Sequence, residues 1–145
     1  MPRRVLAVVT AAYLLAVAWI TLNPFPPDPH RNSLLTSLLA LFAETPALTW
    51  VTYDVVEFSA NILMFVPMGV LLTLLLGREH WWLALALGIA ATLTIEFVQL
   101  FLPARYSDAR DLLANTLGTA VGIAIVLGSA AAATARGRRA AATGS

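Results

Sequence analysis

The sequence contains no cysteine and no lysine, and it is poor in charge of either sign. Without cysteine the chain can form no disulfide, no thiolate nucleophile and no thiolate metal site. Charged residues make up 12 % of the chain, against about 25 % in a typical soluble domain. The net charge of +1 gives no electrostatic basis for nucleic-acid binding. The low share of charged residues excludes a soluble globular protein, and the small net charge excludes nucleic acid as a partner.

Hydrophobic residues make up 59 % of the sequence, which also excludes intrinsic disorder. A helix crosses a bilayer with about 20 apolar residues, within a range near 17–25. Since backbone groups in lipid must be paired within each segment, the sequence predicts an all-α polytopic membrane protein. We expect one transmembrane domain over residues 1–135 and a basic, disordered tail over 136–145. The four predicted spans are Val5–Leu22, Phe58–Leu76, Trp81–Leu102 and Leu112–Ala133.

The first span has a second interpretation, as a secretory signal. Two arginines precede an apolar run that contains Ala-Val-Ala at 16–18, a pattern typical of a cleavage site. The apolar run continues past this point to Leu22. This continuation favours a retained transmembrane helix.

The orientation follows from arginines near the ends of the spans, because cytoplasmic segments are enriched in positive charge. With the N-terminus inside, six arginines lie on the cytoplasmic side and three on the outer side. We therefore predict a bacterial multi-pass membrane protein with both termini in the cytoplasm. The inner set is Arg3, Arg4, Arg78, Arg136, Arg138 and Arg139, and the outer set is Arg31, Arg105 and Arg110.

The first external segment, Asn23–Glu57, begins with a proline-rich stretch that ends the first helix. Leucines and a phenylalanine then recur at helical spacing over 34–42, in a run too short to span a bilayer. We expect a short interfacial or re-entrant helix there. Trp50 and Tyr53 suit one membrane interface, and Trp81 and Trp82 suit the other.

Strongly polar residues inside the spans gather in the outer half of the bilayer. Glu96 lies six residues before the end of the third span, roughly 9 Å deep at 1.5 Å per residue. Gln99 lies three residues further on and shares its helix face. Asn61 and Asn115 each lie three residues inside a span that enters from outside. Because polar groups are costly in lipid, this one-sided clustering predicts a polar site.

The connection between the third and fourth spans adds to this site. Arg105, Asp108, Asp111 and Asn115 are spaced 3, 3 and 4 residues apart, so one helical face can hold all four. Ser107 is the predicted N-cap of a helix that begins near Asp108. Both acids would also complement the helix dipole, so capping alone is an alternative role for them.

Small residues and one proline indicate close helix packing. Pro67 in the second span is expected to kink its helix and free a carbonyl one turn earlier. Gly118 and Gly122 form a small-xxx-small face, and Gly69 suits the same purpose.

These residues together resemble the VanZ-like family of membrane proteins. The segment from Asn61 to Gly69, with Phe65 and Pro67, is similar to one family motif. Glu96, Gln99 and Arg105 resemble a second motif, and the run from Asp108 through Asn115 to Gly122 resembles a third. The resemblance implies a multi-span bacterial envelope protein and a link to low-level resistance to the glycopeptide teicoplanin.

Three functions remain open from the sequence. The first is a non-enzymatic site that binds a membrane lipid, a lipid-linked cell-wall precursor or a lipoglycopeptide antibiotic, with Arg105 meeting a phosphate or carboxylate. The second is a lipid-headgroup enzyme in which Glu96 is a general base and Asp108, Asp111 and Asn115 hold Mg²⁺. His30 and His80 lie outside the spans and no serine is adjacent to a plausible base, so we favour a non-enzyme without cofactor or metal. The third is a structural or transport-associated subunit, and the oligomeric state is not predicted.

Overall fold

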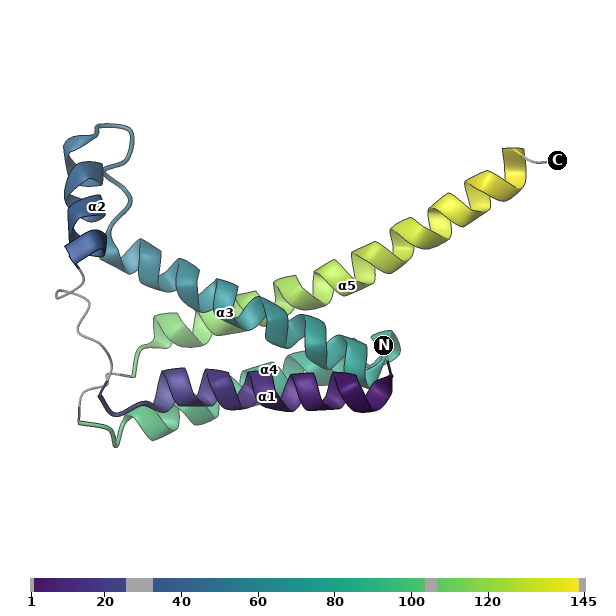
Figure 1. The fold of residues 1–145 in the computed structure, drawn as a ribbon, viewed down its shortest axis with the longest axis horizontal. Helices are drawn as coiled ribbons and strands as arrows, with labels where there is room; N and C mark the ends of the chain where they lie inside the picture. Colours follow the sequence, from purple (N-terminus) through teal and green to yellow (C-terminus); the bar gives the residue numbers. More distant parts are fainter. Residues whose placement is uncertain (1, 26–32, 104–106, 144–145) are drawn as a thin grey trace.

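The computed structural model describes residues 2–25, 33–103 and 107–143 of the chain, and every regular element in these ranges is a helix. Four long helices form a bundle, and a shorter helix lies at one end of it (Figure 1). The elements are α1 (Arg3–Leu22), α2 (Ser33–Glu44), α3 (Tyr53–Leu76), the 3-10 turn η2 (Arg78–His80), α4 (Trp81–Gln99) and α5 (Ala109–Thr143).

Within the described residues, four helices are long and apolar enough to cross a membrane, which confirms the predicted all-α polytopic fold. Their outward faces are apolar, with Leu15, Trp19, Leu63 and Phe97 each more than half exposed. Their inward faces carry several buried threonines, such as Thr73, whose hydroxyl donates to a carbonyl one turn earlier in its own helix. An apolar outside around a partly polar inside is the arrangement expected of a bundle surrounded by lipid.

The interface of α3 with α5 is the most extensive in the bundle and depends on glycine. A Cβ atom on Gly69 would lie 2.1 Å from the Thr119 carbonyl oxygen, and one on Gly118 would lie 2.2 Å from the Ile62 carbonyl oxygen. The two backbones therefore approach more closely than any larger residue allows. Phe65 is fully buried beside this contact.

Pro67 lies inside α3, which continues as one helix to Leu76. The Tyr13 hydroxyl of α1 donates a hydrogen bond to the Met64 carbonyl, three residues before the proline. This bond ties α1 to α3 in the turn before the proline. The carbonyl that loses its intrahelical donor to Pro67 belongs to Leu63, one residue before the carbonyl that Tyr13 contacts.

The helix boundaries differ from the predicted spans at the end of the bundle that holds the polar residues. α3 begins at Tyr53, five residues before the predicted Phe58, because Thr52 caps it by accepting a hydrogen bond from the Val55 amide at 3.4 Å. α4 ends at Gln99 instead of Leu102. The apolar run defines the lipid-facing length, whereas caps and turns define where the hydrogen-bonded helix begins and ends.

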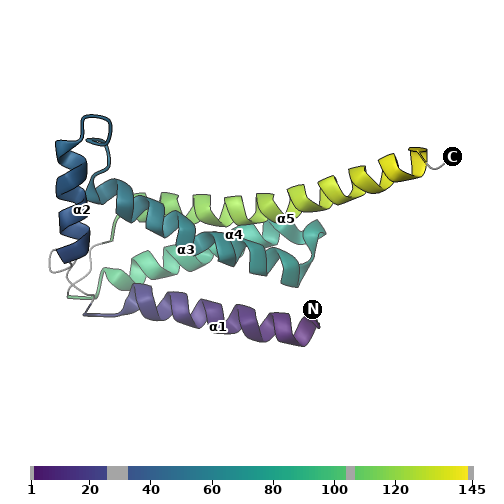
Figure 2. The same ribbon diagram turned by 45° about the horizontal axis from the view of Figure 1, so that its top comes forward.

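α2 lies across the direction of the other helices, at the end of the bundle away from the N-terminus (Figures 1 and 2). Its leucines at 34, 38 and 41 are exposed, which leaves an apolar stripe uncovered by the bundle. The predicted short helix is therefore present, and its transverse position favours the interfacial interpretation over a re-entrant one.

α5 continues to Thr143 and extends beyond the other helices (Figure 1). The sequence predicts a disordered tail from residue 136, whereas the structure shows helix through residues 136–143. The segment contains three alanines and three arginines, and both residue types have high helix propensity, which accounts for the continuation.

Candidate functional site

A cavity of about 270 Å³ opens where α1 and α4 end and where α3 and α5 begin. All four long helices contribute to its lining, and it lies toward the end of the bundle that carries α2 (Figure 1). Five of the seven residues predicted as a polar cluster line this cavity, although their helices are far apart in sequence. The polar lining residues are Thr21, Glu57, Asn61, Glu96, Gln99, Asp111 and Asn115.

Gln99 connects α4 to the last turn of α1. Its side-chain Nε2 donates to the Thr21 carbonyl oxygen at 3.0 Å, and both groups are buried. Because a carbonyl oxygen only accepts, this bond fixes which way the amide faces. The Gln99 Oε1 atom is consequently directed away from Thr21, and no donor in the described ranges reaches it.

Glu96 connects α4 to the segment that leads into α5. Its Oε2 accepts a hydrogen bond from the Ser107 hydroxyl at 2.8 Å and another from the Asp108 amide at 2.9 Å. The residue is 8 % exposed, so this carboxyl group lies inside the bundle. Its second oxygen, Oε1, is buried and lacks a donor from any residue that the structure describes.

Two asparagines complete the cluster, each bonded to a neighbouring helix or turn. Asn61 of α3 donates from Nδ2 to Asp111 Oδ1 of α5 at 2.7 Å. Asn115 of α5 donates from Nδ2 to the Thr92 hydroxyl of α4 at 2.9 Å. The Asn115 Oδ1 atom is a third buried acceptor with no donor among residues 2–25, 33–103 and 107–143.

Asp108 has a different position from the one predicted for it. Its side chain lies outside the cavity and accepts a hydrogen bond from the Arg110 amide at 2.8 Å, while its backbone oxygen accepts from Asp111. Asp108 is therefore the N-cap of α5, and Ser107, the predicted cap, donates to Glu96 instead. A carboxylate at this position satisfies the free amides of the first turn and complements the helix dipole.

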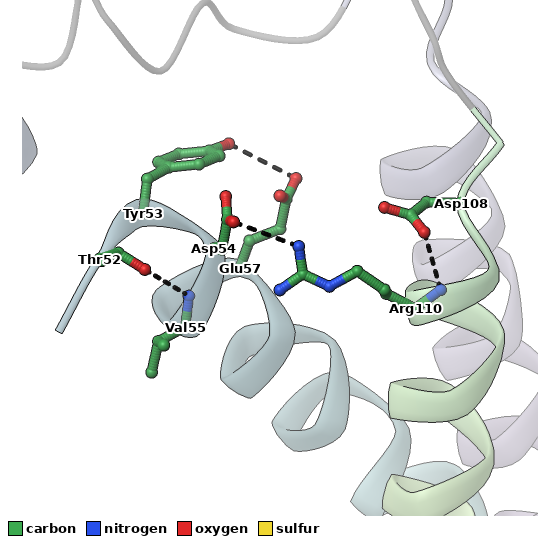
Figure 3. A network of polar contacts seen from close by, with 7 residues as sticks. All are labelled: Thr52, Tyr53, Asp54, Val55, Glu57, Asp108 and Arg110. Atoms are coloured by element: carbon green, nitrogen blue, oxygen red, sulfur yellow. Dashed lines mark hydrogen bonds and ion pairs between the residues drawn. The ribbon is translucent and has the colours of Figure 1, made fainter. Parts of the chain in front are cut away.

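A second set of polar contacts lies next to the cavity on the exposed side (Figure 3). Arg110 pairs with Asp54 at 3.2 Å between Nη1 and Oδ2, and both side chains are more than half exposed. The Tyr53 hydroxyl donates to Glu57 Oε1 at 3.5 Å, and Glu57 also lines the cavity. This set links the first turns of α3 and α5, and Arg110 thus does not point into the cavity.

The described lining of the cavity is acidic. Glu57, Glu96 and Asp111 contribute carboxyl groups, and none of the described lining residues is basic. Arg105, the predicted partner for a phosphate or carboxylate, lies outside the described residues. No group of three or more His, Cys, Asp or Glu side chains with the geometry of a metal site occurs in the part of the chain that the structure describes.

Sequence reasoning did not identify Glu57, Thr21, Thr92 or the bond from Ser107 to Glu96. Glu57 lies four residues before Asn61, and this spacing places the two side chains on the same helix face. It was missed because the apolar run that marked the span begins one residue later. The threonines gave no signal, since most threonines in these helices bond only to their own backbone.

These features define a polytopic helical membrane protein with a buried polar cavity at one end of its bundle. The sequence pattern of the VanZ/LLP1 family matches residues 10–131, which include parts of all four long helices and every polar residue of the cavity. The chain belongs to the VanZ/LLP1 family. Searches of curated proteins and of solved structures found no match to the chain.

Proposed function

We propose that this protein binds the polar headgroup of an envelope lipid, or of a lipid-linked precursor, in its cavity. The observation that supports this function is a set of three buried oxygen atoms, on Glu96, Gln99 and Asn115, that have no donor among the residues the structure describes. Buried polar groups are almost always hydrogen-bonded, and an unmade bond is costly. All three residues line the cavity, so a ligand bound there would lie beside all three.

The proposed site faces the outer leaflet. The cavity lies at the end of the bundle opposite the N-terminal Arg3 and Arg4 and opposite Arg78 in the turn between α3 and α4 (Figure 1). Positive charge favours the cytoplasmic side, so these arginines support an inner position for their end of the bundle. The cavity then opens toward the leaflet where lipid-linked envelope precursors are used.

The size of the cavity favours a headgroup over a whole antibiotic. Pockets for drug-sized molecules have volumes of about 300–1,000 Å³. At about 270 Å³ the cavity is just below that range and accommodates a lipid headgroup. A lipoglycopeptide scaffold is far larger than a drug-sized molecule, so any tolerance to teicoplanin would act through an envelope lipid and not through enclosure of the antibiotic.

We expect Asn115→Leu to remove most of the lipid that co-purifies with the protein while the bundle stays folded. Leucine has a similar shape but lacks both the buried Oδ1 acceptor of Asn115 and its donor to Thr92. Lipid extracted from protein purified in mild detergent would be identified by mass spectrometry, and the thermal midpoint would report folding. Thr94→Val, a comparable change on the exposed face of α4, should leave both quantities unchanged.

The outcome of this experiment separates ligand binding from a structural function. Loss of lipid with an unchanged thermal midpoint supports the binding site. Loss of folded protein with the Asn115 variant, with no specific lipid on the parent protein, would favour a structural or transport-associated subunit. In that case the cluster would serve to hold the helices together through interhelical hydrogen bonds.

Teicoplanin tolerance is the expected phenotype if the family's link to this antibiotic applies to this chain. A glycopeptide-sensitive bacterial host that expresses the protein should tolerate more teicoplanin than the same host with an empty vector. Glu96→Gln should remove the difference at equal membrane levels, because it alters the cavity. An unchanged susceptibility with well-expressed parent protein would separate the family's antibiotic link from this chain.

An enzymatic function is the second candidate, and the contact between Ser107 and Glu96 favours it. A carboxylate that accepts a serine hydroxyl hydrogen at 2.8 Å is positioned to act as a general base for that hydroxyl. Turnover of a lipid phosphodiester by the purified protein, abolished by Ser107→Ala, would support this alternative. Stable lipid binding without turnover across a broad panel of lipids would exclude it.

A further inference from the structure

We infer that a second cavity, at the opposite end of the bundle from the first, binds the phosphate of an anionic phospholipid. This cavity has a volume of about 490 Å³ and lies between the first turn of α1 and the turn that joins α3 to α4. Figure 1 shows the N-terminus of α1 beside the end of α3. The two cavities share no described lining residue, so this inference does not depend on the proposed function.

Gly77 forms part of the wall of this second cavity, in the turn after α3. Its φ of +96° lies in the region that glycine adopts without steric cost. A Cβ atom on Gly77 would lie 2.4 Å from Glu79 Oε1, so the Glu79 carboxyl group folds back over the glycine. The glycine therefore determines where the acidic side chain of this turn lies.

The Glu79 carboxyl group is also paired within the turn. Its Oε1 lies 3.5 Å from His80 Nδ1, and the same nitrogen lies 3.1 Å from the Leu76 carbonyl oxygen. Both oxygens are acceptors, so Nδ1 carries a hydrogen that it donates toward them. Arg3, which lines the same cavity, forms no ion pair with the described residues and is available to an anion from outside the chain.

Positive charge predominates around this second cavity. Arg3 lines it, Arg4 follows Arg3 in the chain, and Arg78 lies directly after Gly77. All three arginines are exposed, and Glu79 is the single acidic residue of the described lining. A guanidinium group can bind a phosphate through two parallel hydrogen bonds. The charge and the donors at this end of the bundle therefore fit a phosphate.

The apolar part of the wall indicates that the phosphate belongs to a lipid. Leu6, Leu74 and Leu75 line the cavity, and Leu74 is 46 % exposed. Leu74 lies in α3, one of the helices long and apolar enough to cross the membrane, so this apolar surface continues toward the acyl chains. A soluble phosphate ester would not bury these leucines, whereas a phospholipid can cover them with its chains.

The tryptophans that follow the turn place the second cavity at the depth of the headgroups. Trp81 and Trp82 begin α4 and are 45 % and 57 % exposed. Tryptophan is enriched where the hydrocarbon core meets the headgroup layer. A volume of about 490 Å³ lies within the range of about 300–1,000 Å³ that is typical of small-molecule sites, so a headgroup fits.

The same arrangement favours a lipid with net negative charge over a zwitterionic one. The ammonium group of phosphatidylethanolamine would lie among the arginines, and the nearby Glu79 carboxyl group is already paired with His80. Phosphatidylglycerol has hydroxyl groups in place of the ammonium and adds no positive charge. Basic pockets between membrane helices on the cytoplasmic side are typical sites for anionic headgroups, which agrees with the orientation that the arginines favour.

The test compares phosphatidylglycerol, phosphatidylethanolamine and soluble glycerol 3-phosphate. Each is titrated into delipidated protein in mild detergent, and native mass spectrometry measures the bound fraction. We expect phosphatidylglycerol to bind about fivefold or more tightly than phosphatidylethanolamine, and glycerol 3-phosphate not to bind over the same concentrations. Added salt should weaken the binding of phosphatidylglycerol, because it screens exposed charges.

Arg3→Gln then assigns the preference to the second cavity. It removes one charge from the lining, so phosphatidylglycerol should bind about fivefold more weakly while phosphatidylethanolamine binding is unchanged. Arg136→Gln is the matched control, because it removes the same charge from an exposed position of α5 outside the lining. It should keep the full preference. Both arginines are exposed, so the thermal midpoint should not change in either variant.

The other outcomes would overturn the inference in distinguishable ways. Equal binding of the two lipids would remove the preference for an anionic headgroup, and equal losses in the two arginine variants would assign it to net charge. Tight binding of glycerol 3-phosphate would indicate a site for a soluble phosphate. Asn115→Leu, in the first cavity, should leave the preference intact. Loss of the preference in that variant would place the anionic lipid in the first cavity and would support the proposed function alone.

Discussion

Gly122→Ala should remove most of the folded protein, although it adds a single methyl group. A Cβ atom at this position would lie 2.1 Å from the Val66 carbonyl oxygen, 2.8 Å from the Val70 amide nitrogen and 3.0 Å from the Gly69 Cα. All three are backbone atoms, so no side chain can rotate away and α3 and α5 must separate. Overpacking a core with flexible side chains already costs about 1–3 kcal/mol, and we expect a loss at or above the upper end of that range.

Gly128→Ala is the matched control for this experiment. Gly128 lies in the same helix, and no atom lies within 4 Å of the position its Cβ would take. Alanine is favoured over glycine in a helix by about 1 kcal/mol, so this variant should be as stable as the parent or slightly more so. Thermal midpoints and the monodisperse fraction in size-exclusion chromatography measure both effects. Equal behaviour of the two variants would contradict the close α3–α5 contact.

Gln99→Leu should give the second large effect by loosening α1 from the bundle. The Thr21 carbonyl is one of the last four in α1, which ends at Leu22, so no amide of its own helix pairs with it. The Gln99 amide supplies the missing donor in a buried position. Little water replaces it inside the bundle, so we expect a loss of about 1–3 kcal/mol in unfolding free energy. The same change removes one of the cavity's unpartnered acceptors and should reduce bound lipid.

Leu100→Met is the control for Gln99→Leu, since Leu100 is the next residue along the chain and is 65 % exposed. Unfolding in increasing SDS, followed by circular dichroism, gives the free energies of the three proteins. The control should match the parent. A Gln99→Leu variant as stable as the parent would mean that the bond to Thr21 does not hold α1 in place.

Most of the architecture was predictable from the sequence because bilayer thickness imposes a length on each apolar run. The number of long helices, the short helix in the first loop and the clustering of Asn61, Glu96, Gln99 and Asn115 all followed from where polar residues interrupt those runs. The helix ends at Tyr53 and Gln99 did not follow, because a capping threonine and a terminal turn set them.

The roles of Ser107 and Asp108 show why local rules were insufficient at the site. Serine and aspartate are both strong N-cap residues, and the sequence alone ranks them almost equally. Glu96 decides between them: it lies 11 residues from Ser107 in the chain and accepts its hydroxyl hydrogen, which leaves Asp108 to cap α5. A partner from another helix thus determines the local structure.

By itself the sequence determined that this is a four-span helical membrane protein with its strongest polar residues near one end, because burial of a polar group in lipid is too costly to be accidental. The tertiary structure alone decided what those residues offer a ligand. Gln99 and Thr21 are 78 residues apart, and Asn61 and Asp111 are 50 apart. Since an amide both donates and accepts, only these distant acceptors decide which way each amide faces.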